Sequence, residues 1–203
     1  ILKEDEFVRV VNNCLEITAK NDILLTLGIT PSRPDTGYGY IQFTDEKIAE
    51  HKKARKVKTF TEKPDQELAL NFLDSGDFLW NSGMFIWSAQ SISLAYRKHL
   101  RDMYEVFEEG KEFYNTIEEK EFIDRVFPGL KNISIDYGIM EKSDNVYVYP
   151  ADFGWSDLGT WGSLYTHLDL DDNKNAIQGK EVMLYDCSEN IVKVADDKLV
   201  LMQ

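Results

Sequence analysis

The sequence is short of several features that mark specialised classes of protein. Its 203 residues include two cysteines, too few for a disulfide framework, which favours a reducing compartment such as the cytoplasm. No apolar run approaches the roughly 18 residues of a membrane-spanning helix, and the opening I-L-K-E-D-E does not resemble a signal peptide. Basic residues are outnumbered, since 23 Lys and Arg against 36 Asp and Glu give a formal net charge of −13. We therefore expect a cytoplasmic protein whose partners are neither nucleic acid nor membrane, because it has no basic stripe for phosphates.

Several familiar catalytic motifs are also missing. The sequence has no G-x-S-x-G elbow, no Walker A loop and no Cys/His metal array. Its three histidines, His51, His99 and His167, lie in helical or charged segments without ligand spacing, so we do not expect them to be catalytic. What is present, 43% hydrophobic and 12% aromatic residues, is the composition of a globular domain with one sizeable core.

Hydrophobic periodicity predicts an α/β fold. Residues 3–20 repeat apolar side chains at helical spacing, and the continuous apolar run at 23–29 is typical of a strand covered on both faces. After about residue 170, short apolar runs alternate with polar breaks, which predicts a first domain at 1–170 and a partial C-terminal β domain at 171–203. The remaining predicted elements are strands at 40–43, 57–60, 84–87 and 146–149, helices at 66–75, 92–107, 134–141 and 158–168, and an amphipathic segment at 111–126.

Four clusters of polar residues, three of them with glycine, adjoin the predicted strands. They are T-G-Y-G-Y at 36–40, T-E-K-P at 61–64, W-N-S-G at 80–83 and G-W-S-D-L-G at 154–159. Glycine lets the backbone approach a ligand closely, and a sheet presents such groups at the ends of its strands. We therefore expect the four clusters to surround one small polar ligand.

Each candidate residue in these clusters has a structural alternative. Asp157 could bind Mg²⁺ beside a phosphate, or cap a following helix. Glu62 and Lys63 could meet the hydroxyls and the phosphate of a ligand, or form a solvated surface pair. Asn81 could bridge two hydroxyls or form an Asx turn, and Gly39 could approach a ligand or simply allow a bend. The residues alone leave these alternatives open.

Taken in order, five motifs resemble those of the nucleotide-sugar pyrophosphorylases. They are R-P-D-T-G-Y-G-Y-I, F-T-E-K-P, W-N-S-G-M-F-I-W, S-I-D-Y-G-I-M-E-K and G-W-S-D-L-G-T-W. The resemblance covers roughly residues 1–168, and the first and fourth motifs favour the bacterial mannose-1-phosphate guanylyltransferase branch. It implies a Rossmann-like, glycosyltransferase-A-like nucleotidyltransferase fold, with a mixed sheet flanked by helices and a C-terminal β appendage that begins a left-handed β-helix.

The resemblance also implies an activity and roles for the candidate residues. The activity is transfer of GMP from GTP to mannose 1-phosphate, which gives GDP-mannose and pyrophosphate with Mg²⁺ as cofactor. Asp157 matches the family's metal-binding aspartate, and Lys63 matches the lysine that meets the sugar phosphate, so both would be catalytic. The other matches would bind the sugar through a carboxylate, an amide or the backbone: Glu62, Asn81, and Gly39 with Tyr38 beside it.

The sequence departs from the family pattern at its start. The family opens with a Gly-rich, Arg-containing nucleotide loop and has a second metal-binding aspartate in a short D-H motif, and neither occurs in these 203 residues. The chain therefore resembles an N-terminally incomplete member, which we expect to be inactive alone. The alternatives are a non-catalytic sugar-phosphate-binding or regulatory module, and the same chemistry with another sugar or base. Subunit contacts such as those of a homodimer would form through the segment after residue 170.

Overall fold

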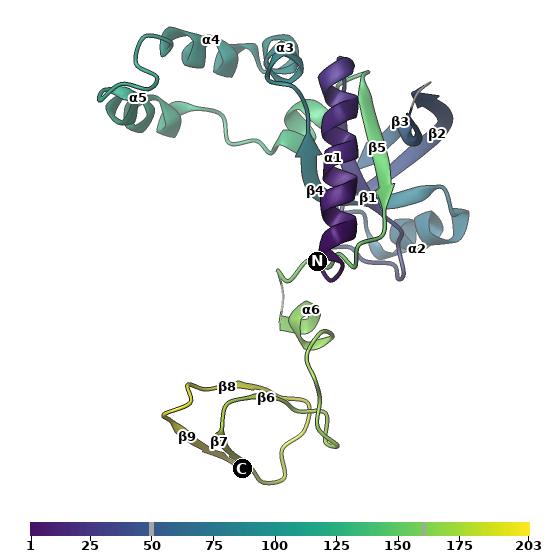
Figure 1. The fold of residues 1–203 in the computed structure, drawn as a ribbon, viewed down its shortest axis with the longest axis vertical. Helices are drawn as coiled ribbons and strands as arrows, with labels where there is room; N and C mark the ends of the chain where they lie inside the picture. The colour runs from purple at the N-terminus through teal and green to yellow at the C-terminus, as the bar shows by residue number, and fades with distance from the viewer. Residues whose placement is uncertain (49–50, 160) are drawn as a thin grey trace. The chain divides into compact units, whose positions relative to one another are not determined.

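The chain forms two compact units, Ile1–Trp155 and Ser156–Gln203 (Figure 1). The structure is a computed structural model that describes residues 1–48, 51–159 and 161–203, without the side chain of residue 52. The predicted domain boundary at 170–171 lies inside the second of these units. Within the described ranges, no helix is both long enough and apolar enough to cross a membrane.

A mixed five-stranded sheet forms the centre of the first unit. Its strands lie in the order β1–β4–β2–β3–β5, and the sheet closes because β5 pairs with β1 as well as with β3. β1 and β5 run parallel, whereas β1–β4, β2–β3, β2–β4 and β3–β5 are antiparallel. The strands are β1 (Leu24–Ile29), β2 (Tyr40–Ile48), β3 (His51–Thr61), β4 (Phe78–Ile86) and β5 (Val146–Ala151).

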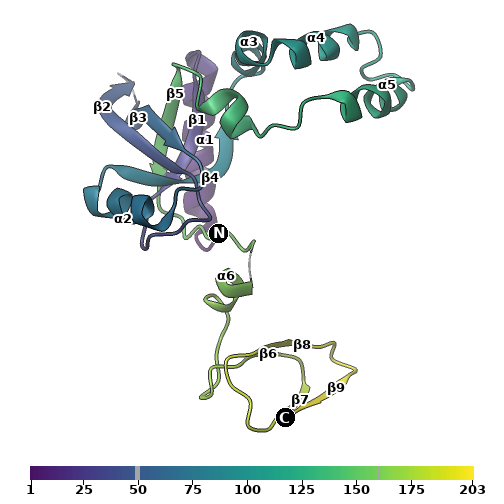
Figure 2. The same cartoon turned by 180° about the vertical axis from the view of Figure 1, so that it is seen from behind.

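Packed elements cover both faces of β1, which confirms the buried strand predicted from its apolar run. On one face α1 (Glu4–Lys20) contributes Val10 and Ile17 to a core that includes Leu25 and Leu27. Figures 1 and 2 show this helix lying along the sheet. On the other face Leu24 packs with side chains from the other strands, from α3 and from a π-helical turn, η2. This second face carries the candidate site. The two elements that cover it are α3 (Ala89–His99) and η2 (Asp136–Met140).

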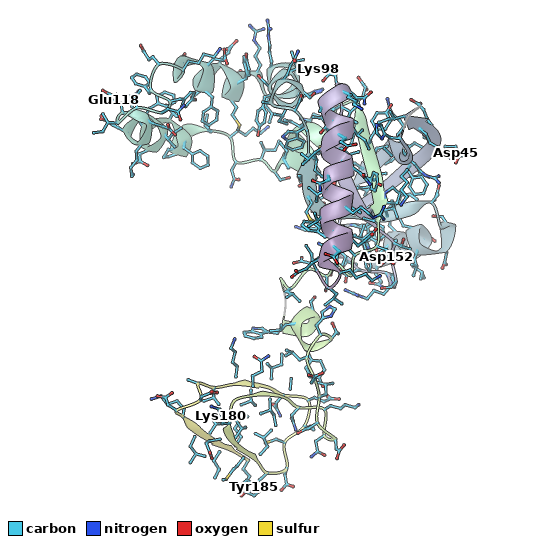
Figure 3. All side chains as sticks on the ribbon, in the orientation of Figure 1. Asp45, Lys98, Glu118, Asp152, Lys180 and Tyr185 are labelled. Carbon is cyan, nitrogen blue, oxygen red and sulfur yellow. The ribbon has the colours of Figure 1, made fainter. Side chains whose placement is uncertain are left out.

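The helices between β3 and β5 agree with the prediction in part. α2 (Gln66–Ser75) is confirmed, with Asp65 as its N-cap and Gly76 ending it at φ +74°. The long helix predicted at 92–107 is wrong, because the chain breaks at Leu100 (φ −134°, ψ 53°) into α3 and α4 (Arg101–Glu109). Within the predicted amphipathic segment 111–126 the helix is α5 (Glu119–Val126), which begins just after the labelled Glu118 in Figure 3.

Four strands are longer than predicted, and β5 is the least changed of them because it extends only to Ala151. β2 and β3 continue as a paired hairpin into the charged residues beyond 43 and before 57. β4 begins at Phe78 rather than at residue 84, so the W-N-S-G cluster is part of a strand and not a turn. Gly83 lies at φ +72° within β4, close to a shift in the β1–β4 register. The glycine that suggested a turn therefore lies at an irregular point within a strand.

The second unit consists of one short helix and two pairs of parallel strands. The helix predicted at 158–168 is reduced to α6 (Trp161–Tyr165). β6 (Ala176–Gln178) pairs in parallel with β8 (Ile191–Lys193), and β7 (Glu181–Leu184) pairs in parallel with β9 (Leu199–Met202). Parallel pairing between strands from successive turns of the chain agrees with the predicted start of a β-helix.

Candidate functional site

Three of the four predicted clusters meet on the second face of the sheet. Gly39 precedes β2 and Glu62 follows β3, and the pairing of Tyr40 with Thr61 places them side by side. Asn81 of β4 joins them, because its backbone N–H donates to the Gly39 carbonyl oxygen at 2.8 Å. The absence of a side chain at Gly39 leaves room for the Glu62 carboxylate: an added Cβ would collide with Glu62 Oε2 and lie 3.4 Å from Asn81 Cβ.

The Asn81 side chain connects this cluster to two further elements. Its Oδ1 accepts hydrogen bonds from Thr26 Oγ1 at 3.0 Å and from the Gly83 backbone N–H at 3.2 Å. Its Nδ2 donates to Asp136 Oδ1 at 3.0 Å. The Asx-type bond to Gly83, which was the structural alternative for Asn81, is therefore present together with two side-chain bonds. Thr26 is fully buried, so the network is anchored in the sheet.

Three carboxylates, from Glu62, Asp136 and Glu141, act on one another at this site. Burial and the charge of Asp136 raise the pKa of Glu62, while Lys63 partly opposes the shift. Burial and the charges of Glu62 and Asp136 likewise raise the pKa of Glu141. Carboxylate oxygens accept hydrogen bonds from hydroxyls, so such a group suits the polyol part of a ligand better than its anionic part.

Sequence reasoning assigned no role to Asp136 and Glu141, although both lie in a motif it singled out. They are brought together by η2, in which the Glu141 N–H donates to the Asp136 carbonyl oxygen at 2.9 Å, five residues back. An α-helix repeats every 3.6 residues, so its periodicity does not place positions five apart on one side. The signal in the sequence that could have identified these two residues was the presence of two acids in the motif D-Y-G-I-M-E.

Lys63 supplies a positive charge next to the carboxylates. Its Nζ lies 3.6 Å from Glu62 Oε1, and its side chain is 64% exposed while that of Glu62 is 14% exposed. Of the surface pair considered as an alternative, Lys63 is exposed to solvent whereas Glu62 is not. Lys63 also adopts φ +49°, a conformation uncommon for a residue with a side chain and one that recurs at functional sites.

Tyr38 has its side chain in an aromatic cluster rather than among the carboxylates. Its ring packs edge-on against Trp80 at 4.9 Å and against Trp155 at 5.4 Å between centroids. The hydroxyl oxygen accepts from Arg33 Nη2 at 3.3 Å. The aromatic cluster thus holds the loop that carries Gly39.

Asp157 belongs to the second unit and is characterised by the contacts of its own loop. Its Oδ1 accepts from the Gly159 backbone N–H at 3.0 Å. The following helix, α6, begins at Trp161, so Asp157 is not its N-cap. The preceding strand, β5, ends at Ala151, so Asp157 does not lie at the strand end either. Asp157 therefore lies after β5 and before α6 in the chain but adjoins neither element.

Comparison with known proteins assigns the chain to a family. The Nucleotidyl transferase family matches residues 1–174. The chain belongs to that family. This confirms the resemblance stated from the motifs, and the nucleotidyltransferase fold with its mixed sheet and flanking helices is confirmed with it.

Individual members of the nucleotidyl transferase family resemble most of this chain. It is 36% identical over 191 residues to mannose-1-phosphate guanylyltransferase of Salmonella montevideo, covering 88% of this chain and 39% of that protein. It is 35% identical over 188 residues to alginate biosynthesis protein AlgA of Pseudomonas fluorescens, covering 91% and 38%. A crystal structure described as mannose-1-phosphate geranyltransferase from Thermus thermophilus superposes with a TM-score of 0.79 at 28% identity, covering 98% of this chain and 56% of that one. The chain thus spans less than half the length of these two curated relatives.

The resemblance to this family implies a magnesium ion. The residues present can supply a carboxylate ligand to such an ion but not its whole set of ligands. Within residues 1–48, 51–159 and 161–203, no three His, Cys, Asp or Glu side chains form a group able to hold a metal ion. Mg²⁺ is commonly held by one or two carboxylates while substrate phosphates provide further oxygens. Asp157 therefore fits a site shared with a phosphate, and does not fit a cage made of protein ligands alone.

Proposed function

We propose that this chain forms the sugar-phosphate side of a nucleotidyltransferase that makes GDP-mannose and pyrophosphate from GTP and mannose 1-phosphate. The observation that carries the proposal is the meeting at one place of Gly39 before β2, Glu62 after β3 and Asn81 within β4. Family membership and relatives named mannose-1-phosphate guanylyltransferase support the reaction class.

The proposed binding mode follows from the charges of the site. Glu62 accepts hydrogen bonds from sugar hydroxyls, and Asn81 contacts the same end of the sugar. Repulsion from the carboxylates turns the phosphate away from Glu62 and toward the exposed ammonium group of Lys63. The sugar phosphate oxygen is thereby oriented for in-line attack on the α-phosphorus of GTP, a reaction that depends on positioning and charge neutralisation. Mg²⁺ bound by Asp157 would neutralise phosphate charge.

The test is an assay of the product of the complete open reading frame. With GTP, mannose 1-phosphate and Mg²⁺, we expect release of pyrophosphate and formation of GDP-mannose. Lys63→Ala is expected to raise the KM for mannose 1-phosphate about tenfold or more, because a charged hydrogen bond contributes about 1.5–3 kcal/mol. Competition with other nucleoside triphosphates and sugar 1-phosphates decides the base and the sugar. Failure to form any nucleotide sugar would refute the proposal.

A second candidate is a binding module that holds a sugar phosphate without catalysing transfer. It is favoured by the fact that the cluster around Asn81 is complete within the first unit. Calorimetric titration of the 203-residue chain with mannose 1-phosphate, without nucleotide, measures that binding directly. Binding by the chain together with no turnover by the complete gene product would favour this candidate over the first.

A further inference from the structure

We infer that Asp136 is a positioning residue that fixes the amide orientation of Asn81, so that Asn81 offers the sugar a hydrogen-bond donor. This deepens the proposed function and rests on it as far as the ligand is concerned. The orientation itself is a property of the protein alone.

Two contacts of unambiguous polarity determine the orientation. The Gly83 backbone N–H is a donor and lies 3.2 Å from Asn81 Oδ1, whereas an ionised Asp136 carboxylate is an acceptor and lies 3.0 Å from Asn81 Nδ2. Turning the amide over would place the Asn81 oxygen against the carboxylate and its NH₂ group against the Gly83 N–H. Thr26 Oγ1 lies 3.0 Å from Asn81 Oδ1 and 3.3 Å from the Met84 carbonyl oxygen, and its single proton fits either acceptor, so the orientation rests on Gly83 and Asp136.

Asp136 is itself held by the core. It begins η2, whose last three residues, Gly138, Ile139 and Met140, are buried under the sheet face. Its carbonyl oxygen accepts the Glu141 N–H that closes the wide turn. Because this backbone is fixed by packing, its carboxylate can orient a neighbouring amide at little entropic cost. A carboxylate on an exposed loop would lose more conformational freedom in doing so.

The fixed orientation restricts what Asn81 can do. Its Oδ1 already accepts two hydrogen bonds, while one of the two Nδ2 hydrogens is used by Asp136. Asn81 therefore presents a single N–H to a ligand, next to Glu62, which presents only acceptors. One hydroxyl can accept from Asn81 and donate to Glu62 at the same time. This narrows the earlier expectation that Asn81 bridges two hydroxyls with both of its atoms.

The test is a double-mutant cycle read by calorimetric binding of mannose 1-phosphate to the 203-residue chain and by the KM of the complete gene product. Asp136→Ala is expected to raise the Kd about tenfold, which corresponds to the loss of one hydrogen bond of strength between that of a neutral and that of a charged bond. Asp136→Asn is expected to restore most of it, because an amide oxygen accepts the same bond. In the background of Asn81→Ala, Asp136→Ala should cause no further loss, since it acts through Asn81.

Matched controls separate positioning from general disruption. Asp144→Ala removes an exposed carboxylate paired with Lys98 and should leave binding unchanged. Thr26→Val should weaken binding through Asn81. Its matched control is Thr18→Val, which removes a buried threonine hydroxyl that is hydrogen-bonded within α1. Thermal melts of each variant show whether it is folded.

Three results would overturn the inference. Losses from Asp136→Ala and Asn81→Ala that simply add, or an Asp136→Asn variant as weak as Asp136→Ala, would mean that the Asp136 charge contacts the sugar directly. A ligand-free measurement tests the contact independently: the NMR signals of the Asn81 side-chain amide, one proton of which bonds Asp136, should shift in Asp136→Ala and change much less in Asp136→Asn. Signals that do not respond to Asp136→Ala overturn the inference, whereas wild-type protein that binds no mannose 1-phosphate overturns the proposed function.

Discussion

Replacing Gly39 by alanine should separate ligand binding from folding. Gly39 is not among the glycines with positive φ, so its backbone accepts an alanine. The added Cβ would meet the Glu62 carboxylate, which is the far end of a flexible side chain, and would come within 3.4 Å of Asn81 Cβ. Glu62 must therefore turn away, while the surrounding strands can stay where they are.

The expected magnitudes differ widely for stability and for binding. Gly→Ala at a compatible backbone position gains about 0.4–1 kcal/mol from the unfolded chain, which offsets the tight contact at Asn81, so we expect unfolding free energy to change by about 1 kcal/mol or less. The Glu62 carboxylate makes charged hydrogen bonds worth about 1.5–3 kcal/mol each. Loss of one such bond raises the Kd for mannose 1-phosphate by about 10- to 100-fold.

The assay combines calorimetric titration with urea unfolding. Gly37→Ala is the matched control, because it lies in the same loop and its Cβ would approach Asp35 Oδ1 at 3.2 Å instead of Glu62. Glu62→Ala should reproduce the binding loss, and the double variant of Gly39→Ala with Glu62→Ala should bind no more weakly than Glu62→Ala alone. Wild-type affinity in Gly39→Ala, or an equal loss in Gly37→Ala, would refute the argument that Gly39 exists to admit the Glu62 carboxylate.

Three further predictions concern the core, the carboxylates and the proposed metal. Gly28→Ala should lower the unfolding free energy measured with urea by about 2–3 kcal/mol. The reason is that the added Cβ would lie 2.5 Å from Val148 Cγ2 and 2.7 Å from Leu79 Cδ1. An unchanged midpoint of urea unfolding would contradict this prediction. The pKa of Glu62 is raised from its usual 4.5, so the ligand-free protein loses stability as the pH rises through the pKa of the folded protein. Glu62→Gln should therefore have a higher melting temperature than wild type at about pH 7 and the same melting temperature at about pH 4. A difference in melting temperature that is the same at both pH values would show that ionisation is not the cause. In the complete gene product, Asp157→Asn should lower turnover by about 100-fold or more at an unchanged melting temperature, and a normal rate would exclude a metal role.

The parts of the fold that the sequence predicted are those with a local physical signal. The segment 3–20 carries an apolar stripe, and 23–29 is apolar throughout because helices cover both of its faces. α2 was delimited by its C-terminal glycine, Gly76, whose left-handed conformation ends the helix. In each case the signal lies in consecutive residues of the sequence.

The parts that were missed depend on partners distant in sequence. The charged residues at 44–48 and 51–56 belong to strands because β2 and β3 pair with each other, not because of their own alternation. Leu100 interrupts a helix without a proline or glycine to announce the break. Gly83 suggested a turn, yet its positive φ is accommodated within β4 next to β1.

The candidate site was predictable as a set of positions and not as a network. Glu62, Lys63, Asn81 and Gly39 were identified from their clusters, and the structure brings them together. The partners of Asn81 on β1 and η2 could not be identified, because they come from segments 55 residues away in each direction.

The single wide turn at residues 136–140 makes the length of this segment more restrictive than its composition. Adding one residue between Asp136 and Glu141 would place the two acids six positions apart, on different sides of a helix, and would displace them relative to the buried Ile139 and Met140. Homologous chains should therefore exchange side chains here more readily than they gain positions. A one-residue insertion would be a sharper probe of this site than any substitution within it.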